Sequence, residues 1–145
     1  MYTVTQLVIS EQPADKTLTL PFEKRQKSRF RATLDSGESV AVILPRGTAL
    51  RDGDRLATEE GAMILVQAAK EQVSTASSTE AQLLCCAAYH LGNRHVPVQI
   101  EAHRLRYGRD HVLDEMLRRL GLQVIHEFVS FEAEPGAYGY QSHSH

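Results

Sequence analysis

Four histidines are the residues best suited to chemistry, because neutral imidazole is the commonest side-chain ligand for nickel, zinc and copper ions. They are His95, His111, His143 and His145. His95 follows a predicted helix and precedes a predicted strand, so regular structure would hold it while its ring faces outward. A second interpretation is structural: the ring of His95 would satisfy the free carbonyl groups at the helix end.

One histidine per chain makes a poor metal site, but a two-fold dimer would bring two copies of His95 to one interface. His143 and His145 lie two residues apart near the end of the sequence. They could complete the coordination sphere or pass metal inward, and the entropy lost on ordering them would weaken binding and ease release. The alternative for both is a solvated polar ending.

His111 falls in the first turn of a predicted helix that Asp110 caps. The positive end of the helix dipole disfavours imidazolium and keeps the ring able to coordinate, but it also opposes a bound cation. The effect of the dipole on His111 as an additional ligand is therefore not one-sided, and we expect Asp110 to be a cap rather than a ligand.

The remaining histidines and the two cysteines are predicted to have no part in metal binding. His90, His103 and His126 are expected to be structural or merely exposed. Cys85 and Cys86 are neighbours in a helical pattern, where side chains diverge by about 100° and cannot readily form a disulfide. Small cysteines are often buried, so neither thiol is predicted to be a ligand.

The sequence offers no nucleophile with a base, no paired carboxylates and no phosphate-binding glycine loop, so we predict that the chain is not an enzyme. Five basic residues lie within residues 24–31, here called the basic ridge. The ridge suits an acidic protein partner better than RNA, because the predicted strands of the second half offer only Tyr107 for base stacking. The net charge of −2 also argues against nucleic acid as a partner.

No apolar run approaches the roughly 18 residues that cross a bilayer. Residues 1–6 lack the basic and apolar segments of a secretory signal. We therefore expect a cytoplasmic protein without a membrane partner.

Residues 1–72 are predicted to form a small all-β domain. Glycines recur roughly every eight residues between short β-rich runs, which is typical of strands joined by tight turns. Leu44-Pro45-Arg46-Gly47 suits a type I turn. No helical periodicity precedes residue 77.

Residues 73–135 are predicted to contain two helices. Ser77 and Glu80 form a capping-box pattern before the first helix, which Gly92 would end. The second helix would run from Asp110 to a stop at Gly121. Its predicted buried stripe consists of Val112, Leu113, Met116, Leu117 and Leu120.

Strands predicted over residues 71–73, 96–100, 104–107 and 122–131 complete the order β-α-β-β-α-β of a ferredoxin-like domain. The predicted fold class is therefore α+β, with a small all-β domain followed by a ferredoxin-like domain. Residues 136–145 are predicted to be a flexible tail that contains His143 and His145.

Several segments together resemble the signature of the urease accessory protein UreE family, which are nickel metallochaperones. In the second half they are Gly92-Asn93-Arg94-His95-Val96-Pro97-Val98-Gln99-Ile100, Leu105-Arg106-Tyr107 and Asp110-His111-Val112-Leu113-Asp114-Glu115-Met116-Leu117. In the first half they are Lys27-Ser28-Arg29, Leu44-Pro45-Arg46-Gly47, Gly53-Asp54 and Glu60-Gly61. Phe131 to Tyr138 adds a match near the end, so the resemblance spans nearly the whole chain.

The resemblance implies that His95 is the metal ligand at the interface of a homodimer, with Ni(II) as bound cargo and Zn(II) or Cu(II) as alternatives. It implies delivery of nickel to the urease apoprotein through the accessory GTPase UreG. The first domain would be similar to the peptide-binding part of Hsp40-type chaperones and would hold a protein partner. Arg109-Asp110-His111 stands where some members have a metal-binding His-x-His pair, so the pair is broken here and His111 would be a weak additional ligand. The rival interpretation is a metal-independent scaffold for proteins or RNA.

Overall fold

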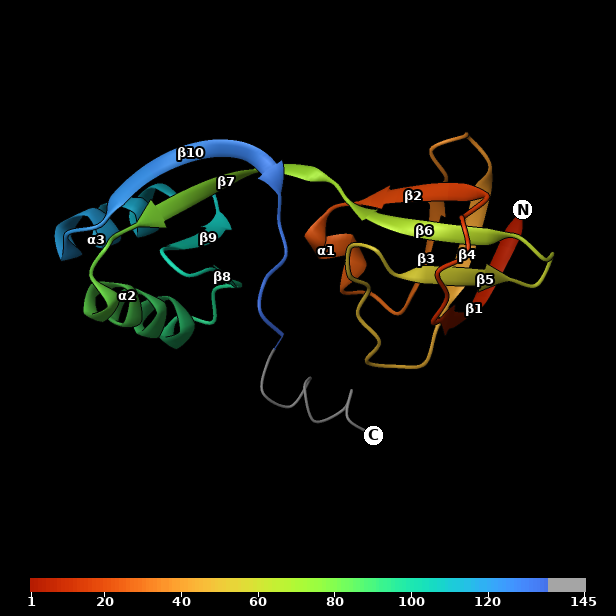
Figure 1. The fold of residues 1–145 in the computed structure, drawn as a ribbon, viewed down its shortest axis with the longest axis horizontal. Coiled ribbons are helices and arrows are strands. Elements are labelled where there is room, and N and C mark those ends of the chain that lie inside the picture. Colours follow the sequence, from red (N-terminus) through yellow and green to blue (C-terminus); the bar gives the residue numbers. More distant parts are fainter. Residues whose placement is uncertain (136–145) are drawn as a thin grey trace. The chain divides into compact units, whose positions relative to one another are not determined.

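The structure, a computed structural model, describes residues 1–135. The chain divides into two compact units, Met1–Ala69 and a second that begins at Lys70 (Figure 1). The first unit consists mainly of strands and the second of strands and helices, which confirms the predicted α+β class. His143 and His145, with the rest of the predicted tail, lie outside the described residues.

Six strands form the sheet of the first unit, in the order β2-β6-β5-β1-β4-β3. They are β1 (Tyr2–Val8), β2 (Lys16–Leu20), β3 (Arg29–Thr33), β4 (Ser39–Ile43), β5 (Arg55–Thr58) and β6 (Met63–Ala68). Along β4, Val40 and Val42 are buried whereas Ser39 and Ile43 are exposed, because successive side chains point to opposite faces of a strand. The buried side of this sheet provides the core of the predicted β domain.

A short helix interrupts the basic ridge. α1 (Phe22–Arg25) follows β2, and the Arg25 side chain is buried. Its Nε donates a hydrogen bond to the Leu20 carbonyl oxygen at 3.0 Å, which compensates part of the cost of burying a charge. Arg29 and Arg31 are exposed on β3. Arg25 is therefore withdrawn from the surface of the ridge, whereas Arg29 and Arg31 remain on it.

The second unit contains β7 (Lys70–Ser77), α2 (Ala81–Asn93), β8 (Gln99–Ile100), β9 (Arg104–Gly108), α3 (His111–Leu120) and β10 (Gln123–Ser130). Its strands form an antiparallel sheet in the order β10-β7-β9-β8. Chain order and sheet order together confirm the predicted ferredoxin-like domain. β8 is shorter than the strand predicted over residues 96–100, and Pro97 has no N–H to donate to a ladder.

Both helices contribute to one core with the inward side chains of this sheet. Buried positions spaced by three or four residues, as on one helix face, are Leu84, Ala87 and Leu91 of α2. Leu113 and Leu117 of α3 join them. Burial of each leucine contributes roughly 1.5–3 kcal/mol, so this core holds both helices on the sheet. Within residues 1–135, no helix has the length and apolar character needed to cross a membrane.

The ends of α3 agree with the prediction. The Asp110 carboxylate accepts hydrogen bonds from the backbone N–H groups of Val112 and Leu113, at 2.9 and 3.0 Å. Gly121 ends the helix in the left-handed region, with φ of 107°. The predicted buried stripe is wrong at Val112, which is 66% exposed. Asp114 takes the buried position instead.

The capping box predicted for α2 is also wrong. Ser77 remains in β7, and Glu80 is the N-cap without a side-chain capping bond. The Ser78 hydroxyl oxygen accepts a hydrogen bond from the Glu80 backbone N–H at 3.0 Å. Pairing of Ser77 with Arg104 and Gln123 in the sheet outweighs the local capping preference, because it satisfies backbone groups on both sides of the strand.

Candidate functional site

His95 lies where α2 ends, in an unusual backbone conformation. Its φ is 58°, and it is the one non-glycine residue with positive φ among residues 1–135. The His95 N–H donates to the Gly92 carbonyl oxygen at 3.0 Å, and the Val96 N–H donates to that of Leu91 at 3.1 Å. This pair of bonds is the Schellman ending of a helix, in which glycine usually occupies the left-handed position. Histidine occupies it here.

The helix stop predicted at Gly92 is therefore wrong, since Gly92 lies inside α2 and the left-handed residue comes three positions later. A left-handed conformation costs an L-residue roughly 1–2 kcal/mol, a cost that glycine avoids. Residues held in such conformations concentrate at functional sites. The backbone conformation of His95 therefore supports its choice as a candidate functional residue.

The His95 ring is exposed. The structural interpretation required the ring to satisfy helix-end carbonyls, but backbone N–H groups of Arg94, His95 and Val96 fill that role. Among the described residues, none forms a hydrogen bond or ion pair with the His95 ring. Both ring nitrogens are therefore accessible to a ligand from outside this chain.

Exposed apolar side chains occur on the elements that precede and follow His95. Tyr89 of α2 is 66% exposed and Ile100 of β8 is 50% exposed. A large apolar residue exposed singly is ordinary, whereas apolar residues on both elements beside one exposed ligand are a feature of contact surfaces.

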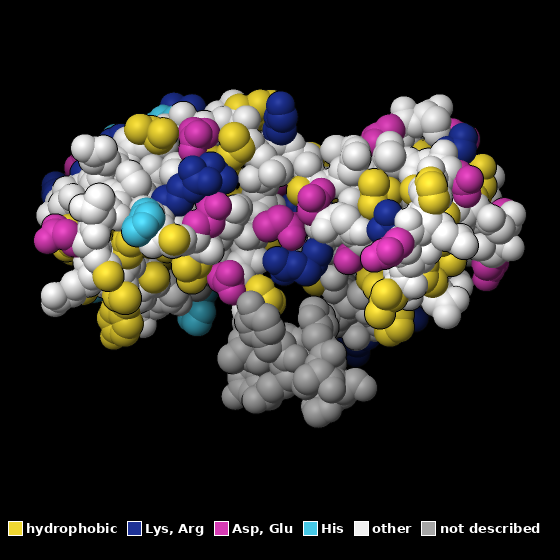
Figure 2. All heavy atoms as spheres, in the orientation of Figure 1, with side chains coloured by type: hydrophobic (Ala, Val, Ile, Leu, Met, Phe, Trp, Pro, Cys, Tyr) yellow, Lys and Arg dark blue, Asp and Glu magenta, His cyan; other side chains and the backbone are white. Residues whose placement is uncertain are grey.

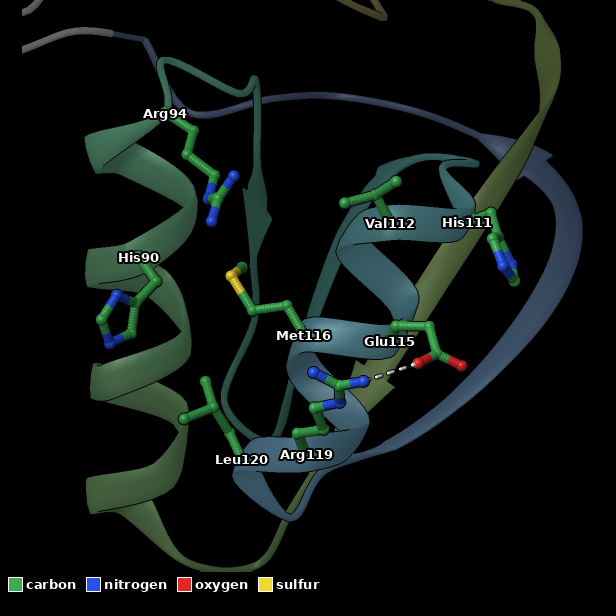
Figure 3. Close-up of a pocket in the computed structure, with 8 residues that line it drawn as sticks. All are labelled: His90, Arg94, His111, Val112, Glu115, Met116, Arg119 and Leu120. Carbon is green, nitrogen blue, oxygen red and sulfur yellow. Dashed lines mark ion pairs between the residues drawn. The ribbon is translucent and has the colours of Figure 1, made fainter.

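His111 is the first residue of α3 and lies at an open groove of about 820 Å³ between α2 and α3 (Figure 3). Val112, Met116 and Leu120 give the groove an apolar floor. His90 lies on the opposite helix, and the two imidazoles point away from one another. The groove therefore does not bring a histidine pair together.

The neighbouring Glu115 forms an ion pair with Arg119 at 3.6 Å. Within residues 1–135, no three or more His, Cys, Asp or Glu side chains gather in a way that could hold a metal ion. Within residues 1–135, no hydrogen bond or ion pair joins His95 to His111, and the metal roles of the four histidines remain predictions.

Tyr107, Asp114 and His126 form a buried polar network that was not predicted from the sequence. Asp114 of α3 is 1% exposed, and its carboxylate accepts a hydrogen bond from the Tyr107 hydroxyl at 2.7 Å. The His126 Nε2 lies 2.7 Å from the other carboxylate oxygen, so His126 has the structural role that was one of its two predicted roles. The three residues are 7 and 12 positions apart, which no local motif would reveal.

Burial and hydrogen bonding oppose each other in this network. Desolvation alone would raise the pKa of Asp114, but hydrogen bonds with His126 and Tyr107 outweigh it and lower the pKa of the carboxyl group. Burial and the bond to Asp114 raise the pKa of the Tyr107 hydroxyl. The carboxylate stays charged and the phenol neutral, so the network joins α3 to β9 and β10.

The two cysteines are exposed, contrary to the expectation that they would be buried. They lie on the outer face of α2, and both are free thiols. His103 is exposed as well, in the turn before β9.

Comparison with known proteins identifies the family. The family models described as the C-terminal and N-terminal domains of UreE urease accessory protein match residues 71–145 and 4–69. A relative named urease accessory protein UreE from Alkalilimnicola ehrlichii is 58% identical, covering 96% of this chain and 85% of the relative. Relatives of the same name from Proteus mirabilis and Citrobacter koseri are 49% and 47% identical, covering 92% and 100% of this chain and 83% and 96% of their own lengths. The chain therefore belongs to the UreE family of urease accessory proteins.

Proposed function

We propose that this protein is a nickel metallochaperone, which binds Ni(II) through His95 in a homodimer and delivers it for assembly of the urease active site. The observation that carries the proposal is the exposed, unengaged imidazole of His95, held on a left-handed residue at the end of α2 in a member of the UreE family. Zn(II) and Cu(II) are alternative cargoes, because imidazole also suits these ions. The protein would act by binding and release, without catalytic turnover.

Dimerisation is part of the proposal because one imidazole does not retain a metal ion. A two-fold axis close to His95 would supply a second imidazole and would cover exposed apolar surface such as Ile100. Removal of that surface from water contributes roughly 25 cal/mol per Å² of apolar area. The dimer would then be stabilised both by burial of apolar residues and by a metal ion that both chains bind.

The tail would supply further donors. His143 and His145 are two residues apart and would bind the same ion from outside the dimer interface. Ligands that must be ordered at each binding event weaken affinity and ease release, which suits delivery to the accessory GTPase UreG and the urease apoprotein in the cytoplasm. The first unit would hold a protein partner.

The alternative of a scaffold that binds RNA would require exposed aromatic side chains on the sheet of the second unit, on which bases could stack. Tyr107, the one aromatic residue that we predicted on the relevant strands, is buried and bonded to Asp114. Acidic and basic side chains are interspersed on the face drawn in Figure 2, where binding to a phosphate backbone would favour a continuous basic surface.

The test is calorimetric titration with Ni(II), with the mass of the protein followed by light scattering. The native chain is compared with His95→Ala, with His103→Ala as a matched exposed histidine of the same unit, and with a chain lacking residues 142–145. We expect about one ion per dimer, binding lost in His95→Ala and kept in His103→Ala, and weaker binding after truncation. Binding that is indifferent to His95, or absent from the native protein, would mean that the metal-independent scaffold is the better description.

A further inference from the structure

Four exposed side chains lie on the outer face of α2, and the geometry of the helix determines which of them are neighbours. Cys85, Cys86, Tyr89 and His90 are all exposed and lie within the helix Ala81–Asn93. Residues four positions apart are neighbours on a helix, with roughly 5–6 Å between their Cβ atoms. Cys86 therefore lies beside His90, and Cys85 lies beside Tyr89.

Cys86 and His90 are one turn apart on the same strip of the helix surface, and both are exposed. Helical side chains lean towards the amino end of their helix, so the side chain of His90 is expected to lean towards the turn that contains Cys86. The Tyr89 ring meets the His90 ring edge-on, with centroids 5.4 Å apart and planes at 77°, and limits its rotation. The pair is accessible from solvent on one side of the helix.

We propose that Cys86 and His90 form a second metal site, a two-ligand thiolate–imidazole site for a thiophilic divalent cation such as Zn(II). Thiolate and imidazole are the preferred ligands of such ions, and two ligands spaced i and i+4 on one helix face are a known zinc-binding arrangement. Water would occupy the remaining coordination positions. The metal displaces the thiol proton of Cys86, which passes to solvent.

The electrostatic surroundings act in both directions. His90 lies in the last turn of α2, where the partial negative charge of the helix end attracts a cation. Arg94, one turn further on, repels it. We therefore expect an exchangeable site rather than a permanently filled one, and it requires neither His95 nor a second chain.

The test is a titration of the full chain with Co(II), a spectroscopic substitute for Zn(II), in the presence of a phosphine reductant. Absorption in the near ultraviolet from thiolate-to-cobalt charge transfer arises only when a cysteine sulfur binds the ion. Histidine sites elsewhere in the protein therefore do not contribute to this signal, so the result does not depend on the proposed nickel site. Zn(II) added afterwards should abolish the absorption by displacement.

Adjacent cysteines provide a matched control. Cys86→Ser should remove the charge-transfer absorption, whereas Cys85→Ser should keep it, because Cys85 has tyrosine rather than histidine as its neighbour. His90→Ala should weaken Co(II) binding at least 10-fold, roughly the loss that follows removal of even an outer-shell partner. All three positions are exposed, and circular dichroism would show that the variants retain the fold.

Three outcomes would overturn the proposal. One is the absence of sulfur-to-cobalt absorption in the native chain. Another is an equal loss of absorption in Cys85→Ser and Cys86→Ser, and the third is absorption unchanged in His90→Ala.

Discussion

At the residue scale, His95 combines an exposed imidazole with a backbone conformation that favours glycine. The Schellman bonds around it satisfy the end of α2 without help from the side chain. The side chain of His95 therefore contributes nothing visible to the fold of the described residues, while its conformation costs free energy. A strained backbone conformation at a side chain that does not support the fold is typical of a residue retained for binding.

Replacement of His95 by glycine should separate these two roles. His95→Gly relieves a left-handed conformation worth roughly 1–2 kcal/mol, and the greater freedom of glycine in the unfolded chain takes back about 0.5–1 kcal/mol. We expect the free energy of unfolding to rise by up to about 1.5 kcal/mol while nickel binding is lost. Urea denaturation at fixed protein concentration measures the first effect and calorimetry the second. A His95→Gly protein less stable than His95→Ala would contradict the proposed strain.

Gly92→Ala tests where α2 ends. Because Gly92 is helical and a Cβ placed on it meets no atom within 4 Å, alanine should raise the free energy of unfolding by about 0.5–1 kcal/mol. If Gly92 were the left-handed stop that the sequence suggested, alanine would destabilise instead. Gly121→Ala, at a true left-handed stop with φ of 107°, is the control and should destabilise. The sign of the change in the urea midpoint of Gly92→Ala shows whether Gly92 is helical or is the left-handed stop of α2.

At the scale of elements, α3 is fixed to the sheet by polar as well as apolar contacts. Leu113 and Leu117 pack into the core, and Asp114 between them bonds to Tyr107 of β9 and His126 of β10. A buried carboxylate is tolerated because both of its oxygens have partners. The same helix presents His111 at its exposed amino end.

Removal of one hydrogen-bond partner of Asp114 should lower the free energy of unfolding. Tyr107→Phe removes the hydroxyl that donates to the buried Asp114 carboxylate, and we expect a loss of about 1–3 kcal/mol in the free energy of unfolding. Tyr89→Phe removes an equivalent hydroxyl from an exposed tyrosine and should change stability by less than about 0.5 kcal/mol. Chemical denaturation of the two variants side by side measures the difference. Equal effects would mean that the buried bond adds nothing.

The lowered pKa of Asp114 predicts a dependence of stability on pH. A carboxyl group whose pKa is lower in the folded than in the unfolded chain stabilises the fold above its usual value of 3.8, and that contribution is lost as pH falls through the folded pKa. Asp114→Asn should therefore flatten the acid side of the stability profile. Glu115→Gln, an exposed neighbour on α3, should leave the profile unchanged. An unaltered acid slope in Asp114→Asn would exclude the network as its source.

At the scale of the whole molecule, two compact units with separate cores divide the work that we propose. The ferredoxin-like unit positions His95, His111 and the cysteines of α2. The β unit presents Arg29 and Arg31 on its edge strand β3, where an acidic partner would find exposed charge. The proposed nickel binding through His95 would thus depend on the second unit and its dimer.

Nickel affinity of the intact protein should fall as the pH is lowered, because protons compete with the metal for the imidazole nitrogens. Calorimetry from pH 8 to 5 measures the change, with the mass followed by light scattering at each pH. A mass that stays constant would show that protonation rather than dissociation of the dimer causes the loss. An affinity flat over this range would exclude histidine ligation.

The sequence by itself determined the order of elements in the second unit, the cap at Asp110, the stop at Gly121 and the family, because these depend on periodicity and on residues close together in the chain. The tertiary structure decided the end of α2 at His95, the exposure of Val112 and the cysteines, and the partners of Asp114. Contacts between residues far apart in the chain set the exposure of Val112 and the partners of Asp114, whereas α2 ends at His95 through local backbone hydrogen bonds that no glycine in the sequence marks. Sheet pairing held Ser77 in a strand, and packing against the core fixed which side of each helix faces inward. Hydrogen bonds from two distant strands made a buried carboxylate stable.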